Sequence, residues 1–417
     1  MNRWTGAAAI LALATTLFGC GARDAVSAPT VAPTTISPNA DGKDDVASIT
    51  YRVNAAATVD IYLSDATGKR FDLRRSEERT PSPAPYQLLF SGVSNGRLVP
   101  DGAYTWHLDA TARGRTQSFS GTLLIRDGQQ AFPALKDFTI SSKVLSPNRD
   151  AIDDHVYVGM YLTARAKLSV FVEGPNGYHF DVPRREGNLL RPQTELEVLD
   201  PGRYEFDYDG GINSNAEPPP DGNYVLVAQS EDKIGQRSVV TAPISLVESG
   251  RPTAEITIQP LDGNGVSWSR TGPLVTMQLG DVMYFTASVQ NVGTVPIRTA
   301  GPFVGADCYS MTDNWYTKGF RQEPGIFRVG LDYDSNPGAD HPFRWGVGSL
   351  QNLTKVERDG NTLYYLPVGA QSVVQGCVLF DKVPVRNPFN LWAALIQEDV
   401  EVVNDHVTPV LIQLVTK

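Results

Sequence analysis

The sequence predicts an all-β protein built from three antiparallel β-sandwich domains in tandem. Apolar residues alternate with polar residues over short runs, which is the pattern of a strand with one buried face. Turns separate these runs, and the 29 Pro and 37 Gly of the chain are enough to punctuate many short strands. One acidic phrase occurs twice, which indicates two copies of one domain followed by a third domain of different sequence.

Composition sets the size of the protein and argues against one class of partner. The 417 residues suffice for about two to four domains. With 41% hydrophobic and 20% charged residues, the chain is typical of folded globular proteins. The net charge is −10 and no basic run is present, which argues against nucleic acid as a partner because phosphate binding needs clustered Lys and Arg.

The first twenty residues have the features of an export signal. Arg3 precedes an apolar run over 7–18, which is too short to span a membrane as a stable helix. The run ends in Leu-Phe-Gly-Cys at Cys20, which resembles the lipobox of bacterial lipoproteins. The resemblance implies that 1–19 is a signal peptide and that Cys20 is lipidated. The mature chain is then extracytoplasmic and anchored to the bacterial cell membrane or outer membrane. The alternative is an ordinary secretory signal that contains a cysteine. Residues 20–35, rich in Ala, Pro and Thr, are expected to form a flexible tether.

The repeated phrase is ISPNADGKDDV, which begins at Ile36, and LSPNRDAIDDH, which begins at Leu145. The match continues without a gap well beyond the phrase and keeps its alternating apolar positions. Further on, YQLLFSG matches YEFDYDG and PDGAYTW matches PDGNYVL, with longer loops in the second copy. The repeat therefore predicts two related domains, residues 36–128 and 138–248, each of the size of a β-sandwich.

These motifs resemble the immunoglobulin-like (Ig-like) domain of the flagellar hook-capping protein. The resemblance covers 36–126 and 138–248, and it implies an Ig-like sandwich that serves as a spacer, docking or assembly module. A tryptophan expected in that family is replaced by Phe90 and by Tyr208, which we predict to keep its core role. The second copy also has Ala151 where the family has glycine.

The acidic phrase has two interpretations. Carboxylates this close together offer the hard oxygens that Ca²⁺ prefers, although the spacing is not that of an EF-hand. Alternatively, Asn and Asp accept hydrogen bonds from neighbouring amides and shape a turn. The candidate Ca²⁺ ligands are Asp41, Asp44, Asp45, Asp150, Asp153 and Asp154.

Residues 250–417 do not match the repeat but keep strand-like patterning. The segment 281–297 is typical of a strand, an Asn-Val-Gly-Thr turn and a second strand, and 364–380 and 389–403 add further strands. The N-x-G-T and L-P-x-G motifs resemble those of bacterial adhesion-related Ig-like modules, which implies a third Ig-like sandwich.

Two further cysteines, Cys308 and Cys377, lie in this last third. In an exported protein the preferred prediction is a disulfide between them, which would close a loop of about 70 residues and stabilise the fold by about 4 kcal/mol. The alternatives are two buried free thiols or a catalytic cysteine.

The middle of the last third combines aromatic and charged residues. Aromatic platforms with polar neighbours bind sugars and anchor protein interfaces. The candidate binding residues are Phe327, Tyr333, Phe343 and Trp345. The alternative is that these aromatics are core residues of two strands joined by a loop.

The function predicted from the sequence is non-catalytic: an adhesion, assembly or scaffold protein of the cell envelope, in which a two-domain stalk presents the C-terminal domain. None of the five His has a metal-protease spacing, and no phosphate-binding loop or nucleophile elbow is present. No cofactor other than Ca²⁺ is expected, and the expected partners are the membrane, through the anchor, and an envelope protein or glycan. One alternative is a carbohydrate-binding protein. Another is an extracytoplasmic hydrolase with a site among Asp332, Asp334, Asp340 and His341, although adjacent residues on an extended chain point apart.

Overall fold

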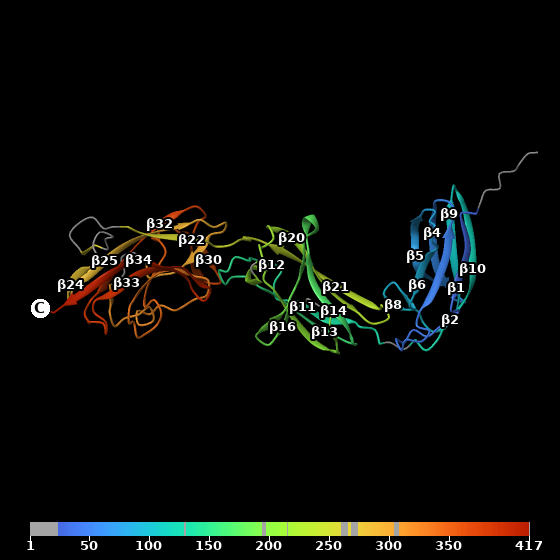
Figure 1. The fold of residues 1–417 in the computed structure, drawn as a ribbon, viewed down its shortest axis with the longest axis horizontal. Coiled ribbons are helices and arrows are strands. Elements are labelled where there is room, and N and C mark those ends of the chain that lie inside the picture. The colour runs from blue at the N-terminus through green and yellow to red at the C-terminus, as the bar shows by residue number, and fades with distance from the viewer. Residues whose placement is uncertain are drawn as a thin grey trace, which may run out of the picture. The chain divides into compact units, whose positions relative to one another are not determined.

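The computed structural model describes residues 24–128, 131–193, 197–214, 216–259, 266–267, 274–303 and 308–416 (Figure 1). Over these residues the fold is all-β, as predicted, with two 3₁₀ turns, η1 (Pro175–Gly177) and η2 (Ile212–Ser214). Contacts divide the chain into two compact units. The first extends to Ala134 and includes 163–167 and 230–238, and the second contains the remaining residues.

The first sandwich consists of β1 (Val26–Ala32), β2 (Thr35–Ile36), β3 (Ala47–Val53), β4 (Ala57–Ser64), β5 (Arg70–Arg79), β6 (Tyr86–Phe90), β7 (Val93–Ser94), β8 (Arg97–Leu98), β9 (Gly102–Ala112) and β10 (Arg115–Ile125). One sheet has the order β1-β3-β6 and the other β2-β10-β9-β4-β5, while β7 and β8 form a separate short hairpin. The core between the two sheets is lined by the alternate residues that the sequence pattern predicts, such as Val59, Ile61 and Leu63.

The tether predicted for residues 20–35 is too long. Strand β1 lies inside that range and pairs antiparallel with β3, and Val26 is fully buried in the core. The register of this pair shifts between Ser27 and Thr30, around Pro29. Proline has no backbone N–H to donate to a sheet, so it is tolerated on an edge strand or at such an irregularity. The proline-rich composition therefore predicted a tether where the chain forms a strand.

The second sandwich consists of β11 (Leu135–Ile140), β12 (Val144–Leu145), β13 (Val156–Leu162), β14 (Ala166–Glu173), β15 (His179–Asp181), β16 (Arg184–Glu186), β17 (Leu189–Arg191), β18 (Val198–Leu199), β19 (Gly202–Tyr208), β20 (Gly222–Glu231) and β21 (Arg237–Leu246). Its sheets have the orders β11-β13-β19-β16-β17 and β12-β21-β20-β14-β15, and β18 pairs with β14.

The C-terminal sandwich consists of β22 (Ala254–Gln259), β23 (Val266–Ser267), β24 (Val275–Gln278), β25 (Val282–Asn291), β26 (Ile297–Thr299), β27 (Tyr309–Ser310), β28 (Phe327–Tyr333), β29 (Phe343–Gly346), β30 (Thr354–Arg358), β31 (Asn361–Leu366), β32 (Gln371–Leu379), β33 (Phe389–Gln397) and β34 (Glu401–Val415). The sheet β22-β25-β32-β27 faces the sheet β24-β34-β33-β28-β26-β31-β30, with β23 paired to β25 and β29 to β28.

The three sandwiches share one topological feature. In each, the N-terminal strand region contributes to both sheets, and its second part runs parallel to the last strand of the domain: β2 to β10, β12 to β21 and β24 to β34. The repeats also share a tyrosine at the start of a central strand whose hydroxyl bonds back to the chain. Tyr104 donates to the carbonyl of Pro100 at 2.7 Å, and Tyr224 donates to that of Pro220 at 2.8 Å. This arrangement resembles the tyrosine corner of Ig-like domains and explains the repeated Pro-Asp-Gly-x-Tyr motif.

The aromatic residues that stand in for the expected tryptophan keep its role. Phe90 is 3% exposed and Tyr208 is fully buried. The predicted core role of both aromatics is therefore confirmed, and each repeat has the two packed sheets of a β-sandwich.

Candidate functional site in the acidic loops and the C-terminal domain

One aspartate closes the acidic loop of the first repeat. The carboxylate of Asp45 accepts hydrogen bonds from the amides of Asn39, Ala40 and Gly42 at 3.1, 2.9 and 2.7 Å. The carboxylate of Asp41 accepts the amide two residues later at 2.8 Å. These bonds satisfy backbone donors that a tight turn would otherwise leave without partners.

The second repeat reproduces this turn. Asp154 accepts the amides of Asn148, Arg149 and Ala151, at 3.1, 2.9 and 2.6 Å, and Asp150 accepts the amide two residues later at 2.9 Å. Turn chemistry therefore accounts for two of the three repeated carboxylates in each loop, Asp41 and Asp45 in the first and Asp150 and Asp154 in the second. Ca²⁺ binding by the six aspartates stays a prediction.

The two loops differ in burial because the C-terminal domain covers the second one. Asp41 is exposed, whereas Asp150 is only 5% exposed. Arg298 donates to the carbonyl oxygen of Asp150 at 2.8 Å, and the hydroxyl of Tyr365 donates to its carboxylate at 3.0 Å. Gln397 donates to the preceding carbonyl at 2.8 Å. The loop whose Asp41 is exposed in one repeat is thus a docking element in the other.

Two further contacts belong to this junction between the second repeat and the C-terminal domain. Arg358 forms an ion pair with Asp153 at 2.5 Å. Gly325 packs so closely on the loop that an added Cβ would lie 2.5 Å from the carbonyl oxygen of Arg149. Sequence reasoning missed Arg298, Tyr365 and Gly325, because each occurs once and outside the repeat.

The segment between the second and C-terminal sandwiches is also held in place. The amide of Ser249 donates to Asp221 at 2.8 Å, and the amide of Gly250 donates to the carbonyl of Pro147 at 3.3 Å. Arg251 donates to the carbonyl of Ala216 at 2.8 Å. This connection is therefore fixed by hydrogen bonds along its length.

Burial changes the acid–base behaviour of the docked loop. Desolvation, assisted by the nearby carboxylate of Asp154, raises the pKa of Asp150 to about 6, although the hydrogen bond from Tyr365 and the charge of Arg298 act in the opposite direction. Burial and Asp150 likewise raise the pKa of Tyr365. The junction therefore contains a carboxyl group that titrates near neutral pH.

The four aromatics predicted as a binding platform belong to the core instead. Phe327 and Phe343 are fully buried, Trp345 is 1% exposed and Tyr333 is 7% exposed. All four belong to the main hydrophobic cluster of the C-terminal domain. The expectation of an exposed platform is wrong for this set. Tyr333 alone also borders a surface hollow of about 300 Å³, between the loops 311–314, 335–342 and 382–385.

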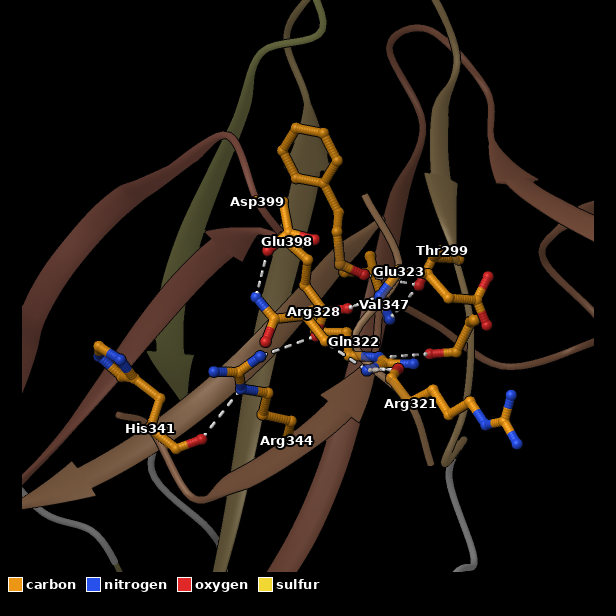
Figure 2. Close-up of polar contacts among 12 residues, drawn as sticks. Thr299, Arg321, Gln322, Glu323, Arg328, His341, Arg344, Val347, Glu398 and Asp399 are labelled. Atoms are coloured by element: carbon orange, nitrogen blue, oxygen red, sulfur yellow. Dashed lines mark hydrogen bonds and ion pairs between the residues drawn. The ribbon is translucent and has the colours of Figure 1, made fainter. Parts of the chain in front are cut away.

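Charged residues beside these aromatics form a buried network. Figure 2 shows Glu398 close to Arg328 and Arg344, and its carboxylate accepts from them at 2.8 and 2.9 Å. The other oxygen of Glu398 accepts the amide of Glu323 at 2.8 Å. Arg328 also donates to the carbonyl of Arg321 at 2.9 Å. The Glu398 side chain is fully buried, so this network ties loops to the sheet from within the domain.

A second polar cluster gathers three residues of the hydrolase alternative. The carboxylate and imidazole atoms of Asp332, Asp340 and His341 that could bind a metal ion lie within 4.8 Å of one another. Among the described residues, this is the one group of three or more such side chains. Asp340 and His341 do not point apart, because His341 has a φ of 46° and the chain is not extended there. Asp334 lies apart from the cluster and accepts the amide of Asn390 at 3.0 Å.

The predicted disulfide is confirmed. Cys308 and Cys377 are bonded, with their Cα atoms 4.7 Å apart. The bond links the loop before β27 to the central strand β32 of one sheet. Cys20 lies outside the described residues. Among the residues that are described, no helix is both long and apolar enough to cross a membrane.

No family model and no curated protein matches this chain. Among solved structures, a tetra-tandem repeat from the extending region of a large adhesion protein is 15% identical over 91% of this chain and 73% of its own, with a TM-score of 0.19. A chimeric titin Z1Z2 tandem is 16% identical over 53% of this chain and 98% of its own, with a TM-score of 0.21. The alpha-2-macroglobulin of E. coli is 15% identical over 94% of this chain, which spans 22% of that protein, with a TM-score of 0.19. At these values the comparisons assign no family and no function.

Proposed function

We propose that this chain is a non-catalytic, extracytoplasmic lipoprotein of the bacterial envelope that works as an adhesion, assembly or scaffold module. In this proposal lipidated Cys20 anchors the chain, and the Ig-like repeats support a C-terminal binding domain. The observation that carries the proposal is the junction at Asp150. A buried carboxylate, two arginines and a close glycine contact couple the second repeat to the C-terminal domain.

Such a junction suits a mechanical support better than it suits a catalyst. A module that presents a binding surface gains affinity when its parts are held in one geometry, because less conformational entropy is lost on binding. The disulfide in the C-terminal domain supports an oxidising, exported setting.

The test uses the full chain, with isolated cell envelopes as the binding partner. We expect the purified chain to cosediment with envelopes, without release of soluble sugars or peptides over time, and binding to fall in a Gly325→Ala variant. Loss of binding after protease treatment of the envelopes supports a protein partner. Loss after muramidase digestion would transfer support to the glycan alternative, and time-dependent release of fragments would support the hydrolase alternative.

The anchor is tested separately. Metabolic labelling with a palmitate analogue is expected to mark the chain and to disappear in a Cys20→Ser variant. Labelling that persists in this variant would contradict the anchor.

A further inference from the structure

The cluster of Asp332, Asp340 and His341 is preorganised by its own hydrogen bonds. Asp332 lies near the end of β28, and its carboxylate accepts the amide of His341 at 3.0 Å. Its other oxygen accepts the side chain of Asn336 at 2.8 Å, and the same Asn336 donates to the carbonyl of Ala339 at 2.8 Å. The loop between β28 and β29 is thereby folded back over Asp332 and carries the Asp340 and His341 side chains with it.

The imidazole of His341 has one nitrogen that finds no hydrogen-bond partner among the residues that the structure describes. His341 is 4% exposed, and its Nε2 lies 3.3 Å from a carboxylate oxygen of Asp405. Its Nδ1 is buried and makes no hydrogen bond, although it lies 3.1 Å from a carboxylate oxygen of Asp340. The separation of Nδ1 and the Asp340 oxygen is short enough for an ion pair, but the angles at these atoms do not fit a hydrogen bond. When Nε2–H donates to Asp405, Nδ1 presents its lone pair to Asp340, and two electron-rich atoms then face each other.

A cation between these atoms removes this conflict. In a tetrahedral site with bonds of about 2.1 Å, neighbouring ligand atoms lie about 3.4 Å apart, close to the separation of Nδ1 and the Asp340 oxygen. Asp332 is only 6% exposed, so its carboxylate lies out of solvent within the same group of ligand-type atoms. The His341 backbone adopts a left-handed conformation, an arrangement that costs energy for a non-glycine residue and persists when its surroundings impose it.

We propose that Asp332, Asp340 and His341 bind a divalent transition-metal ion of the zinc type, with Asp405 orienting the imidazole through Nε2. Imidazole nitrogen favours zinc, copper, iron and nickel ions, whereas Ca²⁺ and Mg²⁺ prefer all-oxygen sites. A carboxylate that holds the second nitrogen of a metal-bound histidine is a common support for such a site. The side chain of Asp340 is 74% exposed, which gives the ion a path from solvent.

The proposed metal ion would hold the loop between β28 and β29 in place. Residues 335–339 and 342 of this loop line the hollow of about 300 Å³. With three protein ligands, the ion keeps a position for water or for an acidic group of a partner. The site thus adds a structural and recognition role that the proposed scaffold function does not require.

The proposal is tested by titrating Zn²⁺ into the chelator-treated full chain at pH 7.5, by calorimetry and without reductant. A Cys20→Ser background removes the thiol outside the disulfide. We expect one ion bound per chain, and the same stoichiometry with Co²⁺, whose visible absorption reports nitrogen and oxygen ligands. Ca²⁺ is expected not to compete at a tenfold excess.

Variants separate this site from adventitious binding. Asp340→Asn, at an exposed side chain that does not endanger folding, is expected to weaken Zn²⁺ binding by more than about tenfold, and Asp405→Asn by about tenfold. His179→Gln is the matched control, because His179 pairs with Asp181 at 3.2 Å on the surface and no group of three ligands includes it among the described residues. Unchanged binding in Asp340→Asn, equal loss in His179→Gln, or no bound ion at all would overturn the proposal.

Discussion

Asp41 and Asp150 occupy the same position of a repeated loop, and their different surroundings give them different chemistry. Both accept the amide two residues later, so the local turn is the same. Asp150 is enclosed by Arg298 and Tyr365, and burial there raises its pKa to about 6. Local sequence specifies the turn, whereas the C-terminal domain sets the acidity.

The raised pKa of Asp150 predicts that stability falls as the pH rises. The folded chain binds this proton more tightly than the unfolded chain, whose aspartates titrate near 3.9, so the free energy of unfolding decreases by about 2–3 kcal/mol between pH 4 and pH 7. Asp150→Asn is expected to remove this part of the slope and to be at least as stable as the parent at pH 7.5. Calorimetric melting across this pH range measures both.

The first repeat supplies the control for this experiment. Asp41→Asn changes the equivalent, exposed carboxylate and is expected to leave the slope as it is in the parent. The pKa of His155 is raised mainly by its hydrogen bond to Asp207, so this histidine also lowers the stability of the protein as the pH rises. Because His155 is present in every variant, its contribution to the slope cancels when the variants are compared. An identical slope in the parent and Asp150→Asn would contradict the prediction.

The buried carboxylate of Glu398 predicts a larger effect. Glu398→Gln keeps the shape of the side chain but leaves Arg328 and Arg344 without their shared negative charge. Removing one partner of a buried ion pair costs about 3–5 kcal/mol, which urea unfolding would detect as a lower midpoint. Glu323→Gln is the control, because its side chain forms an ion pair with Arg298 that is partly exposed, and its loss is expected to cost less than about 1 kcal/mol.

At the scale of the elements, period-two alternation predicted the strands with one buried face. The run of Val59, Ile61 and Leu63 became β4, and the Asn-Val-Gly-Thr turn joins β25 to β26. The same rule failed at β28, where every residue from Phe327 to Tyr333 is buried. That strand is central in its sheet and covered on both faces, so its polar residues are part of the core. The charged neighbours that suggested a surface platform are the buried ion network.

Contacts between distant segments were the least predictable. The disulfide followed from only two cysteines in the last third, whereas nothing in the sequence places Asp405 beside His341 or Tyr365 beside Asp150. Each of these pairs depends on how sheets or domains meet, and a single sequence carries no signal for that.

The disulfide predicts a stability effect confined to one domain. Cys308 and Cys377 are 69 residues apart, so the bond restricts the unfolded chain and is expected to contribute about 4 kcal/mol. A Cys308→Ser, Cys377→Ser variant should show a lower melting temperature for the C-terminal domain and an unchanged transition for the first sandwich. Cys20→Ser serves as the control, and equal shifts of both transitions would contradict the assignment.

At the scale of the whole molecule, one sandwich topology is used in different ways. The first repeat leaves its acidic loop exposed, and the second uses the same loop to bind the C-terminal domain. Duplication supplied two equivalent loops, and a few residues of a third domain made one of them a junction. The functional difference between the repeats therefore resides in their neighbours and not in their own fold.

This view predicts that one methyl group loosens the junction. Gly325 has a φ of 81°, and an added Cβ would meet the carbonyl oxygen of Arg149 at 2.5 Å, so Gly325→Ala forces the second repeat away from the C-terminal domain. Spin labels at Leu189→Cys and Val385→Cys, both exposed, are expected to give a narrow distance distribution in a Cys20→Ser background and a broad one in Gly325→Ala. Gly319→Ala is the matched control, because Gly319 has the same φ of 81° and no atom of the described part of the chain lies within 4 Å of the added Cβ. It carries the backbone strain alone, about 1–2 kcal/mol, and should keep the narrow distribution.

Broadening of the distance distribution in both variants would assign the effect to backbone strain in the C-terminal domain. A narrow distribution in both would show that Asp150, Arg298 and Tyr365 hold the junction without the close glycine contact.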